Sequence, residues 1–269
     1  MQKFAFGDGF SLQKFAFENR CDLQKSIFLN NLNTSYDYSK LSNVNKIYIP
    51  LKYFSDTNFR QIINTLSTKG KIYIYMPNIV KDNFVKHTVN NIDKAFKNFD
   101  ICGIVVSNLS ELNIIKKANI SKDIELIANY TFNVFNKFSI NTLYDLGFTT
   151  ITLSPELDAE SFSKIISSCG NVVELISYSN IPLMSTSYCL LGKSNKCYKD
   201  CKRLCDSSNK FYLKDRYNFK FRVIPDNEQT ITTIYNSRTT KIDYATLNVK
   251  NVRFDIFDET IDEINRIIL

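Results

Sequence analysis

KIYIYMP at residues 71–77 and ICGIVV at residues 101–106 are short runs of β-branched and aromatic side chains that decide the expected fold. Six other runs along the chain have the same character. They are SIFL from Ser26, KIYIP from Lys46, IELIANY from Ile124, TTITLSPEL from Thr149, VVELISY from Val172 and VRFDIF from Val252. The first seven runs start roughly 20 to 30 residues apart, which is the length of one strand, one helix and two loops.

The stretches between these runs have the apolar period of helices. Residues 56–66 place Phe59, Ile62 and Leu66 on one side of a helix. A further helix is expected to start at Asp158, because an acidic side chain stabilises a helix N-terminus.

Eight strands with helical crossovers predict an α/β protein, a (β/α)₈ TIM-like barrel. The alternative is an open, doubly wound sheet, which would usually carry a glycine-rich phosphate turn after its first strand; this chain has no such turn there. Residues 179–251 contain no clear crossover helix. We therefore expect a long cysteine-containing insertion between strands seven and eight, with β-like runs at FKFRVI from Phe219 and TITTIY from Thr230.

The domain organisation follows from this pattern. Residues 21–269 are expected to form the barrel, with the 179–251 insertion included. Residues 1–20 contain QKFAF twice, on either side of a GDG turn, which suits an N-terminal hairpin. A remnant of a larger parent protein is the alternative for these residues.

The composition is typical of a globular protein. Of the 269 residues, 44% are hydrophobic and 23% are charged. No apolar stretch approaches the roughly 20 residues of a membrane span, and residues 1–17 do not form a secretory signal. We therefore expect no membrane association and a cytoplasmic, reducing location. The net charge of +7 indicates either ordinary solubility or a weak attraction to a polyanion such as RNA.

Four of the seven cysteines fall in the 17 residues from Cys189 to Cys205, with the spacing C-x7-C-x3-C-x3-C. If the second half is helical, Cys197, Cys201 and Cys205 share one face, and Cys189 folds back as a fourth thiol. Clustered thiolates repel one another and are stable mainly when a cation binds them. Three interpretations remain: an iron–sulfur cluster, a structural zinc with the same ligands, and unligated thiols.

Polar residues at or after the ends of the predicted strands are further candidates for catalytic or substrate-binding roles. Glu156 lies at the carboxyl end of the sixth run, where barrel enzymes gather catalytic residues, although a salt bridge or a helix cap would also explain it. Asn133 and Asn136 follow the fifth run and are either substrate-binding or turn-forming. Arg216 either clamps an anionic ligand or pairs with an acid on the surface.

The residues give little support for a histidine-based hydrolase. His87 is the only histidine, and it lies in KDNFVKHTVNN, a polar stretch that is expected to be an exposed helix. The chain has no H-E-x-x-H zinc motif. Aromatic residues are spread too evenly along the sequence to mark a base-stacking surface.

Several short motifs, in their order and spacing, resemble the collagenase-like peptidase family U32. They are NVFN at residues 133–136, LSPEL at 153–157, Glu174, PLM at 182–184, CLLG at 189–192, YLKDR at 212–216 and IYNS at 234–237. The similarity extends from about Lys25 to the C-terminus. It implies a barrel fold, and it makes Asn236, in the last motif, a further candidate for substrate binding.

The resemblance also implies two activities. The family is named for peptidase activity, and several bacterial members are iron–sulfur proteins needed for oxygen-independent hydroxylation of RNA bases or quinone precursors. In those members cysteines of this region hold the cluster, which implies a [4Fe–4S] cluster on Cys189, Cys197, Cys201 and Cys205.

We therefore expect a U32 protein that binds an iron–sulfur cluster and acts in the modification of RNA or another anionic substrate. A collagenase-like peptidase acting on a peptide is the alternative. A non-catalytic barrel that serves as a binding module is the second alternative.

Overall fold

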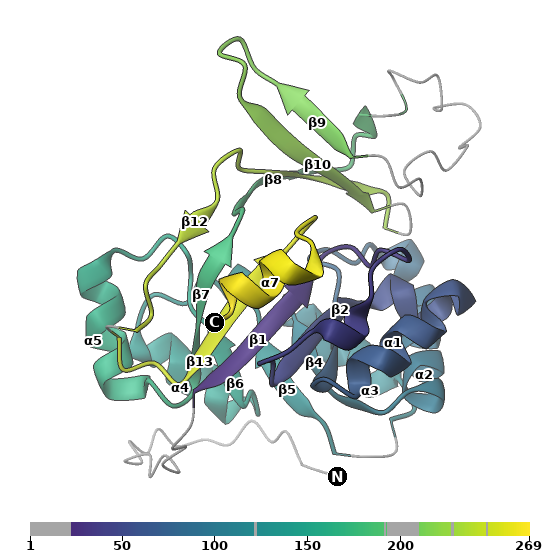
Figure 1. Cartoon of the computed structure of the whole chain (residues 1–269). Coiled ribbons are helices and arrows are strands. Elements are labelled where there is room, and N and C mark those ends of the chain that lie inside the picture. The colour runs from purple at the N-terminus through teal and green to yellow at the C-terminus, as the bar shows by residue number, and fades with distance from the viewer. Residues whose placement is uncertain (1–22, 121–122, 191, 193–209, 227–228, 246) are drawn as a thin grey trace.

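The computed structural model describes residues 23–120, 123–190, 192, 210–226, 229–245 and 247–269 (Figure 1). Within these residues, eight parallel strands close into a barrel. The strands are β1 (Gln24–Leu29), β2 (Lys46–Pro50), β3 (Lys71–Tyr75), β4 (Ile101–Val106), β5 (Glu125–Ala128), β6 (Thr150–Thr152), β7 (Val173–Ser179) and β13 (Asn251–Ile256). The ring closes because β13 pairs with both β7 and β1, while β6 pairs with β7. The predicted (β/α)₈ barrel is confirmed, and each of the eight runs lies on one of these strands.

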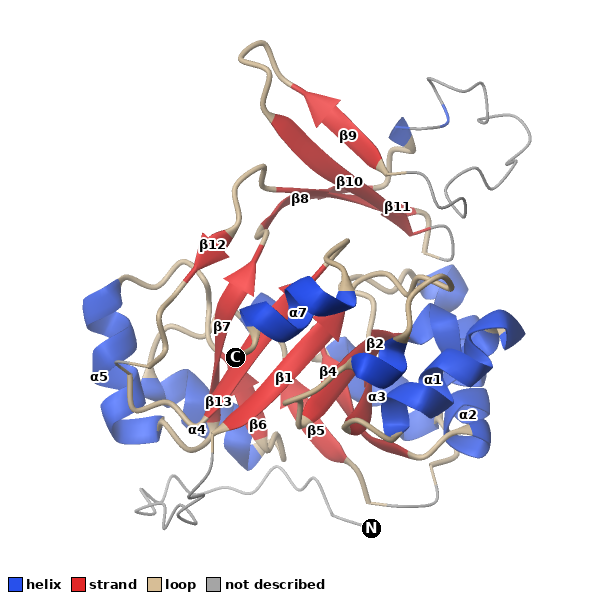
Figure 2. Ribbon diagram, in the orientation of Figure 1, coloured by secondary structure: helices blue, strands red, loops and turns tan. Residues whose placement is uncertain are grey.

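Helices cover the outside of the barrel (Figure 2). The α-helices are α1 (Arg60–Ser67), α2 (Val85–Asn98), α3 (Ser110–Lys117), α4 (Lys137–Asp145), α5 (Ala159–Cys169) and α7 (Ile261–Ile267). Short 3₁₀ helices are η1 (Tyr38–Lys40), η2 (Leu51–Ser55), η3 (Thr57–Phe59), η4 (Asp82–Phe84) and η5 (Tyr130–Phe132). The expected start of α5 is confirmed, because the Asp158 carboxylate accepts a hydrogen bond of 2.8 Å from the backbone N–H of Ser161.

Side chains alternate between two cores along the strands. On β2, Ile47 and Ile49 pack outward against the helices, whereas Tyr48 points into the barrel. The interior cluster consists of Phe28, Tyr48, Tyr73, Tyr75, Val105 and Ile127. Aromatic rings therefore fill the barrel, and rings are large enough to leave no open channel through it.

The chain between β7 and β13 forms a second sheet instead of a covering helix. The strands β8 (Pro182–Thr186), β11 (Ile231–Tyr235), β10 (Lys220–Asp226) and β9 (Phe211–Lys214) pair in that order and are antiparallel. A short strand, β12 (Thr240–Lys241), then pairs with β7. This second sheet lies beyond the carboxyl ends of the barrel strands (Figure 1). Residues 193–209, which hold three of the clustered cysteines, and residues 1–20 lie outside the described part of the chain.

Polar contacts on two sides help to fix the second sheet to the barrel. The Lys81 ammonium donates to the backbone oxygen and the hydroxyl of Thr230, at 3.1 and 2.8 Å. On the other side, Arg222 of β10 forms an ion pair with Asp258, which follows β13. The described helices include none that is long and apolar enough to cross a membrane.

Gly103 on β4 is required by the crowded interior of the barrel. A Cβ atom at this position would lie 2.3 Å from the backbone oxygen of Glu125 and 2.8 Å from the ring of Tyr73. Both distances are far inside van der Waals contact, so a side chain here would push β5 and the Tyr73 ring away.

We predict that Gly103→Ala destabilises the protein by about 1–3 kcal/mol, the usual cost of overpacking a core. The expected fall in the thermal midpoint is several degrees, measured by circular dichroism. Gly70→Ala is the control, since its Cβ would approach backbone atoms of Val44 and Asn45 at the milder distance of 3.2 Å. An equal loss of stability in the two variants would contradict the prediction.

Candidate functional site

Arg253 on β13 lies at the centre of the barrel interior and is completely buried. Its Nε donates to Asp255 at 2.6 Å and its Nη1 donates to Asn129 at 2.9 Å. The guanidinium carbon lies 5.2 Å from the ring centroid of Phe28 and 5.3 Å from that of Tyr75. The barrel therefore encloses a cation that is paired on one side and faced by aromatic rings on the other.

A chain of hydrogen bonds continues from Arg253 across the carboxyl ends of the strands. The Asn129 amide donates to the Tyr75 hydroxyl at 2.7 Å and to the Ser107 hydroxyl at 3.2 Å. The Ser107 hydroxyl in turn donates to the Asn78 side-chain oxygen at 3.2 Å. Polar side chains that follow β3, β4 and β5 are thereby held in one network at the mouth of the barrel.

Two buried acidic side chains lie near this cation, and Asp255 is the one that bonds to it. Asp255 accepts from the Ser179 hydroxyl at 2.8 Å, and Glu174 accepts from the Tyr48 hydroxyl at 2.6 Å and from Thr152 at 2.9 Å. Burial raises the pKa of Asp255, and the neighbouring Arg253 opposes that rise. Burial disfavours the charged form of Arg253, but the two carboxylates and Tyr75 outweigh it, so the pKa of the guanidinium is raised.

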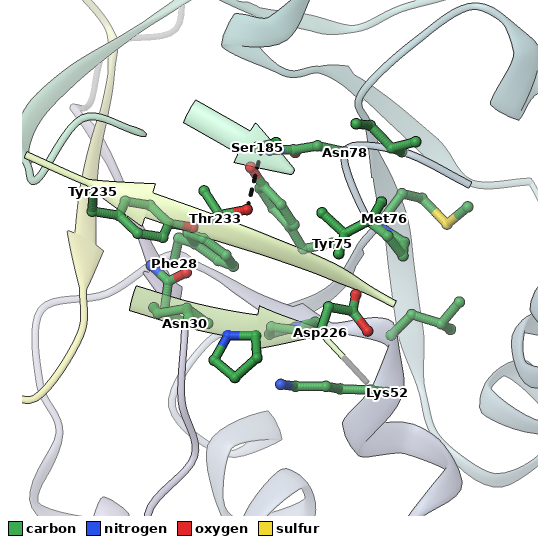
Figure 3. Close-up of a pocket in the computed structure, with 17 residues that line it drawn as sticks. Phe28, Asn30, Lys52, Tyr75, Met76, Asn78, Ser185, Asp226, Thr233 and Tyr235 are labelled. Atoms are coloured by element: carbon green, nitrogen blue, oxygen red, sulfur yellow. Dashed lines mark hydrogen bonds between the residues drawn. The ribbon is translucent and has the colours of Figure 1, made fainter. Parts of the chain in front are cut away.

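A cavity of about 100 Å³ lies between the mouth of the barrel and the second sheet (Figure 3). Its barrel side includes Phe28, Asn30, Lys52, Tyr75, Met76 and Asn78, and its sheet side includes Ser185, Asp226, Thr233 and Tyr235. The rings of Phe28 and Tyr75 stack at 3.9 Å between centroids, and they separate the cavity from Arg253 below. The volume suits one small group more than a whole drug-sized ligand, which needs roughly 300 Å³ or more.

Asn30, directly after β1, offers this cavity a hydrogen-bond donor. Its side chain is 6% exposed, and its Nδ2 has no hydrogen-bond partner among the described residues. A buried amide without a partner is costly, so a ligand oxygen in the cavity would stabilise it. Lys52 and Asp226 add one charge of each sign to the wall.

Glu111, near the start of α3, is a buried carboxyl beside this network. It accepts from the backbone N–H of Ser107 at 2.7 Å and from the Asn108 amide at 2.9 Å. Burial raises its pKa to about 8, although these hydrogen bonds oppose the rise. The group therefore keeps its proton at neutral pH and holds the turn that positions Ser107.

The structure places the candidates Glu156, Asn133 and Asn136 in two adjoining loops. Glu156 is exposed in the turn after β6, and Asn133 has a left-handed backbone with φ of 51° at the end of η5. The Asn136 side chain caps α4 through the backbone N–H groups of Phe138 and Ser139, both at 3.0 Å. The loops adjoin because the N–H of Ser154 donates to the carbonyl of Val134 at 3.3 Å.

The other two candidates lie on the second sheet. Arg216 is exposed in the turn between β9 and β10, with its guanidinium carbon 4.7 Å from the Tyr217 ring centroid. Asn236 follows β11, and its side-chain oxygen accepts from the N–H of Arg238 at 3.2 Å. None of the five candidates, Glu156, Arg216, Asn133, Asn136 and Asn236, is among the residues that line the cavity.

Of the four clustered cysteines, the structure describes Cys189. It is exposed, it follows β8 closely, and its Sγ accepts a hydrogen bond from the N–H of Gly192 at 3.2 Å. Cys197, Cys201 and Cys205 lie outside the described residues. Within the described ranges no three His, Cys, Asp or Glu side chains are grouped to hold a metal ion. His87 is exposed on α2, as expected, 3.0 Å from the Asn91 amide.

Sequence reasoning missed Arg253, Asp255 and Asn129. A signal was present in VRFDIF, because a strand of a barrel is covered on both faces and yet this run alternates charged with apolar residues. Inward-facing charges in a covered strand must be paired, which would have predicted a buried ion pair.

The comparisons with known proteins agree with the fold. The sequence model described as peptidase family U32 matches residues 49–248, which is well over half of the chain. Among solved structures, the U32 peptidase Mk0906 is similar with a TM-score of 0.50 at 11% identity, over 93% of this chain and 99% of that chain. At this identity the likeness concerns the fold alone. No curated protein sequence matches the chain.

We predict that Arg253→Met lowers the free energy of unfolding by about 3–5 kcal/mol, because it leaves buried carboxylates without their cation. Adding Asp255→Asn to this variant should cost much less than Asp255→Asn costs in the wild-type protein. Chemical denaturation of all four proteins measures this coupling. Strictly additive losses would show that the pair does not act as a unit.

Glu111 predicts a dependence of stability on pH. Its pKa is about 8 in the folded state and near 4.5 when unfolded, so folding retains a proton that the unfolded chain loses between these values. Stability from this group is full below pH 4.5 and is lost as the pH rises towards 8, at up to about 1.4 kcal/mol per pH unit. Glu111→Gln should remove this component. Denaturant midpoints of both proteins at pH 5, 6.5 and 8 test it, and parallel curves would contradict it.

Proposed function

The chain belongs to peptidase family U32, and from this membership we propose that it is an iron–sulfur enzyme that modifies RNA or another anionic substrate at the mouth of its barrel. The proposed ligands of the [4Fe–4S] cluster are Cys189, Cys197, Cys201 and Cys205. Zinc on the same four thiolates is the alternative cofactor. A cluster of this kind needs a reducing compartment, so we propose a cytoplasmic location.

The position of Cys189 relative to the cavity carries this proposal. Ser185 of β8 lines the cavity, and Cys189 follows it by four residues. Four residues of extended chain span at most about 14 Å. A metal centre on Cys189 would therefore lie close to a group bound in the cavity.

The surroundings of Cys189 are compatible with cluster ligation. Its thiol is exposed and belongs to no disulfide, so it is available to a metal. The N–H of Gly192 donates to its sulfur, and hydrogen bonds to ligand sulfurs are among the interactions that tune the reduction potential of a cluster. When bound, the cluster would supply one-electron chemistry.

The residues of the cavity would bind and orient the substrate. Phe28 and Tyr75 give the cavity an aromatic wall against which a planar group can pack, and the amides of Asn30 and Asn78 can hydrogen-bond to its edge. Asparagine amides and aromatic rings are the groups that proteins use to recognise exposed nucleobases. The second sheet covers one side of the cavity and so limits the access of water to it.

A peptidase is the second candidate, and the exposed carboxylate of Glu156 beside the mouth is the observation that favours it. A carboxylate can activate a water molecule for attack on a peptide bond. The family name and the name of the structural neighbour, the U32 peptidase Mk0906, point the same way. A barrel that binds a ligand without catalysis is the third possibility.

We predict that protein purified without oxygen contains iron and acid-labile sulfide, at about four of each per chain. Cys189→Ala should lose most of both and the associated visible absorbance. Cys169→Ala is the matched control, because that thiol is buried on α5 and should leave the metal content unchanged.

Other outcomes separate the alternatives. Purified protein that contains zinc but no acid-labile sulfide would support a zinc site in place of the iron–sulfur cluster. Protein without metal whose peptide hydrolysis is abolished by Glu156→Gln would support the peptidase. Protein that contains no metal and hydrolyses no peptide would favour the third alternative, a barrel that binds a ligand without catalysis.

A further inference from the structure

The hairpin formed by β9 and β10 carries a continuous face that begins at the cavity. On β10 alternate residues share a face, so Lys220, Arg222 and Ile224 point to the same side. Ile224 lines the cavity. The strand register places Tyr212 opposite Arg222 and Lys214 opposite Lys220 on this side. The face therefore extends from the cavity to the tip of the hairpin, which projects beyond the barrel (Figure 1).

Large aromatic side chains are exposed along the hairpin. Tyr212 is 44% exposed and Tyr217, in the turn, is 64% exposed. Each has a guanidinium over its ring: Arg222 lies 5.6 Å from the Tyr212 centroid and Arg216 lies 4.7 Å from that of Tyr217. Two exposed rings, each beside a guanidinium, therefore lie on this one hairpin.

The hairpin is also strongly basic. Asp226 lies at the cavity end of β10, and Asp215 lies in the turn, where its carboxylate accepts from the backbone N–H groups of Tyr217 and Phe219 at 2.8 and 2.9 Å. Among the described residues, no acidic side chain lies within ion-pair distance of Lys214, Arg216 or Lys220.

The pairing of Lys214 with Lys220 is unfavourable in the isolated protein. Like charges directly opposite each other on neighbouring strands destabilise a sheet. A bound polyanion would convert this repulsion into two favourable contacts. The arrangement therefore favours an anionic partner at this pair of lysines.

We propose that this face and the adjoining turn, with Tyr212, Lys214, Lys220, Arg216 and Tyr217, dock single-stranded RNA and direct it towards the cavity. The inference rests on the proposed function, since it names the surface that presents the substrate. Single-stranded RNA combines regularly spaced phosphates with unstacked bases, and this face combines cations with exposed rings. An acidic peptide would satisfy the lysines but not the tyrosines.

The test uses fluorescence anisotropy to measure how a fluorescein-labelled oligouridylate binds to the full chain. The oligonucleotide has roughly 12 nucleotides, a length within the range of sites on proteins that bind single strands. Lys214→Ala/Lys220→Ala should weaken binding about tenfold at low salt. It should also reduce the slope of log affinity against log salt by about 1.4, because each phosphate contact in single strands contributes about 0.7. Tyr212→Ala/Tyr217→Ala should weaken binding by at least about tenfold and leave the slope unchanged.

Control variants remove groups of the same kind at the opposite end of the barrel. Lys94→Ala/Lys97→Ala takes two exposed lysines from the carboxyl end of α2, and Tyr144→Ala takes an exposed ring from the end of α4. Neither should change the affinity or the slope. The inference is overturned if the hairpin variants bind as the controls do, or if wild-type protein does not bind the oligonucleotide at low salt. It is also overturned if polyglutamate binds as tightly with the same sensitivity to the tyrosine variant.

Iron and sulfide analysis of each variant separates this inference from the proposed function. RNA binding that depends on the hairpin in protein without a cluster supports the docking surface while the cluster proposal fails. A full cluster in hairpin variants that bind RNA like the controls overturns the docking surface and leaves the cluster proposal standing.

Discussion

The guanidinium of Arg253, enclosed in the barrel, is the constraint on which the site depends. Removing a cation from water costs several kcal/mol, and this cost is offset only by close partners with good geometry. Asp255 provides the charge, Asn129 accepts a second hydrogen bond, and aromatic rings surround the remaining surface. The interior of the barrel is therefore organised around a polar centre and not filled by aliphatic side chains alone.

The side chains at the mouth of the barrel are positioned by hydrogen bonds that lead back to Arg253. The side-chain oxygen of Asn129 accepts a hydrogen bond from Arg253, and its amide nitrogen donates one to Tyr75. These bonds fix the position of the tyrosine hydroxyl. The Tyr75 ring then stacks on Phe28 and forms the floor of the cavity. Asn30, on the same rim, has a buried donor that this network does not satisfy. A fixed floor beside an unsatisfied donor is the arrangement expected where a ligand completes the hydrogen bonding.

The second sheet joins the cavity to the outside of the molecule. β10 lines the cavity with Ile224 and Asp226 at one end and carries Lys220 towards the tip of the hairpin at the other. Between these ends, Arg222 is held by Asp258, and its guanidinium carbon lies 5.0 Å from the centroid of the Phe257 ring. Because this contact ties the strand to the barrel, the basic face keeps a defined direction relative to the cavity.

The sequence by itself determined the strands, their order in a closed barrel and the family. Each strand is a local run of β-branched and aromatic residues, and the cap of α5 is one side chain that bonds three residues onward, so both can be recognised within a few neighbouring positions. Only the tertiary structure decided the site. The bond between Tyr48 and Glu174 spans 126 positions and that between Arg253 and Asn129 spans 124, so no local pattern contains both partners. The pairing of Lys214 with Lys220 likewise depends on strand register, which is set by the turn between the strands and by packing against the barrel.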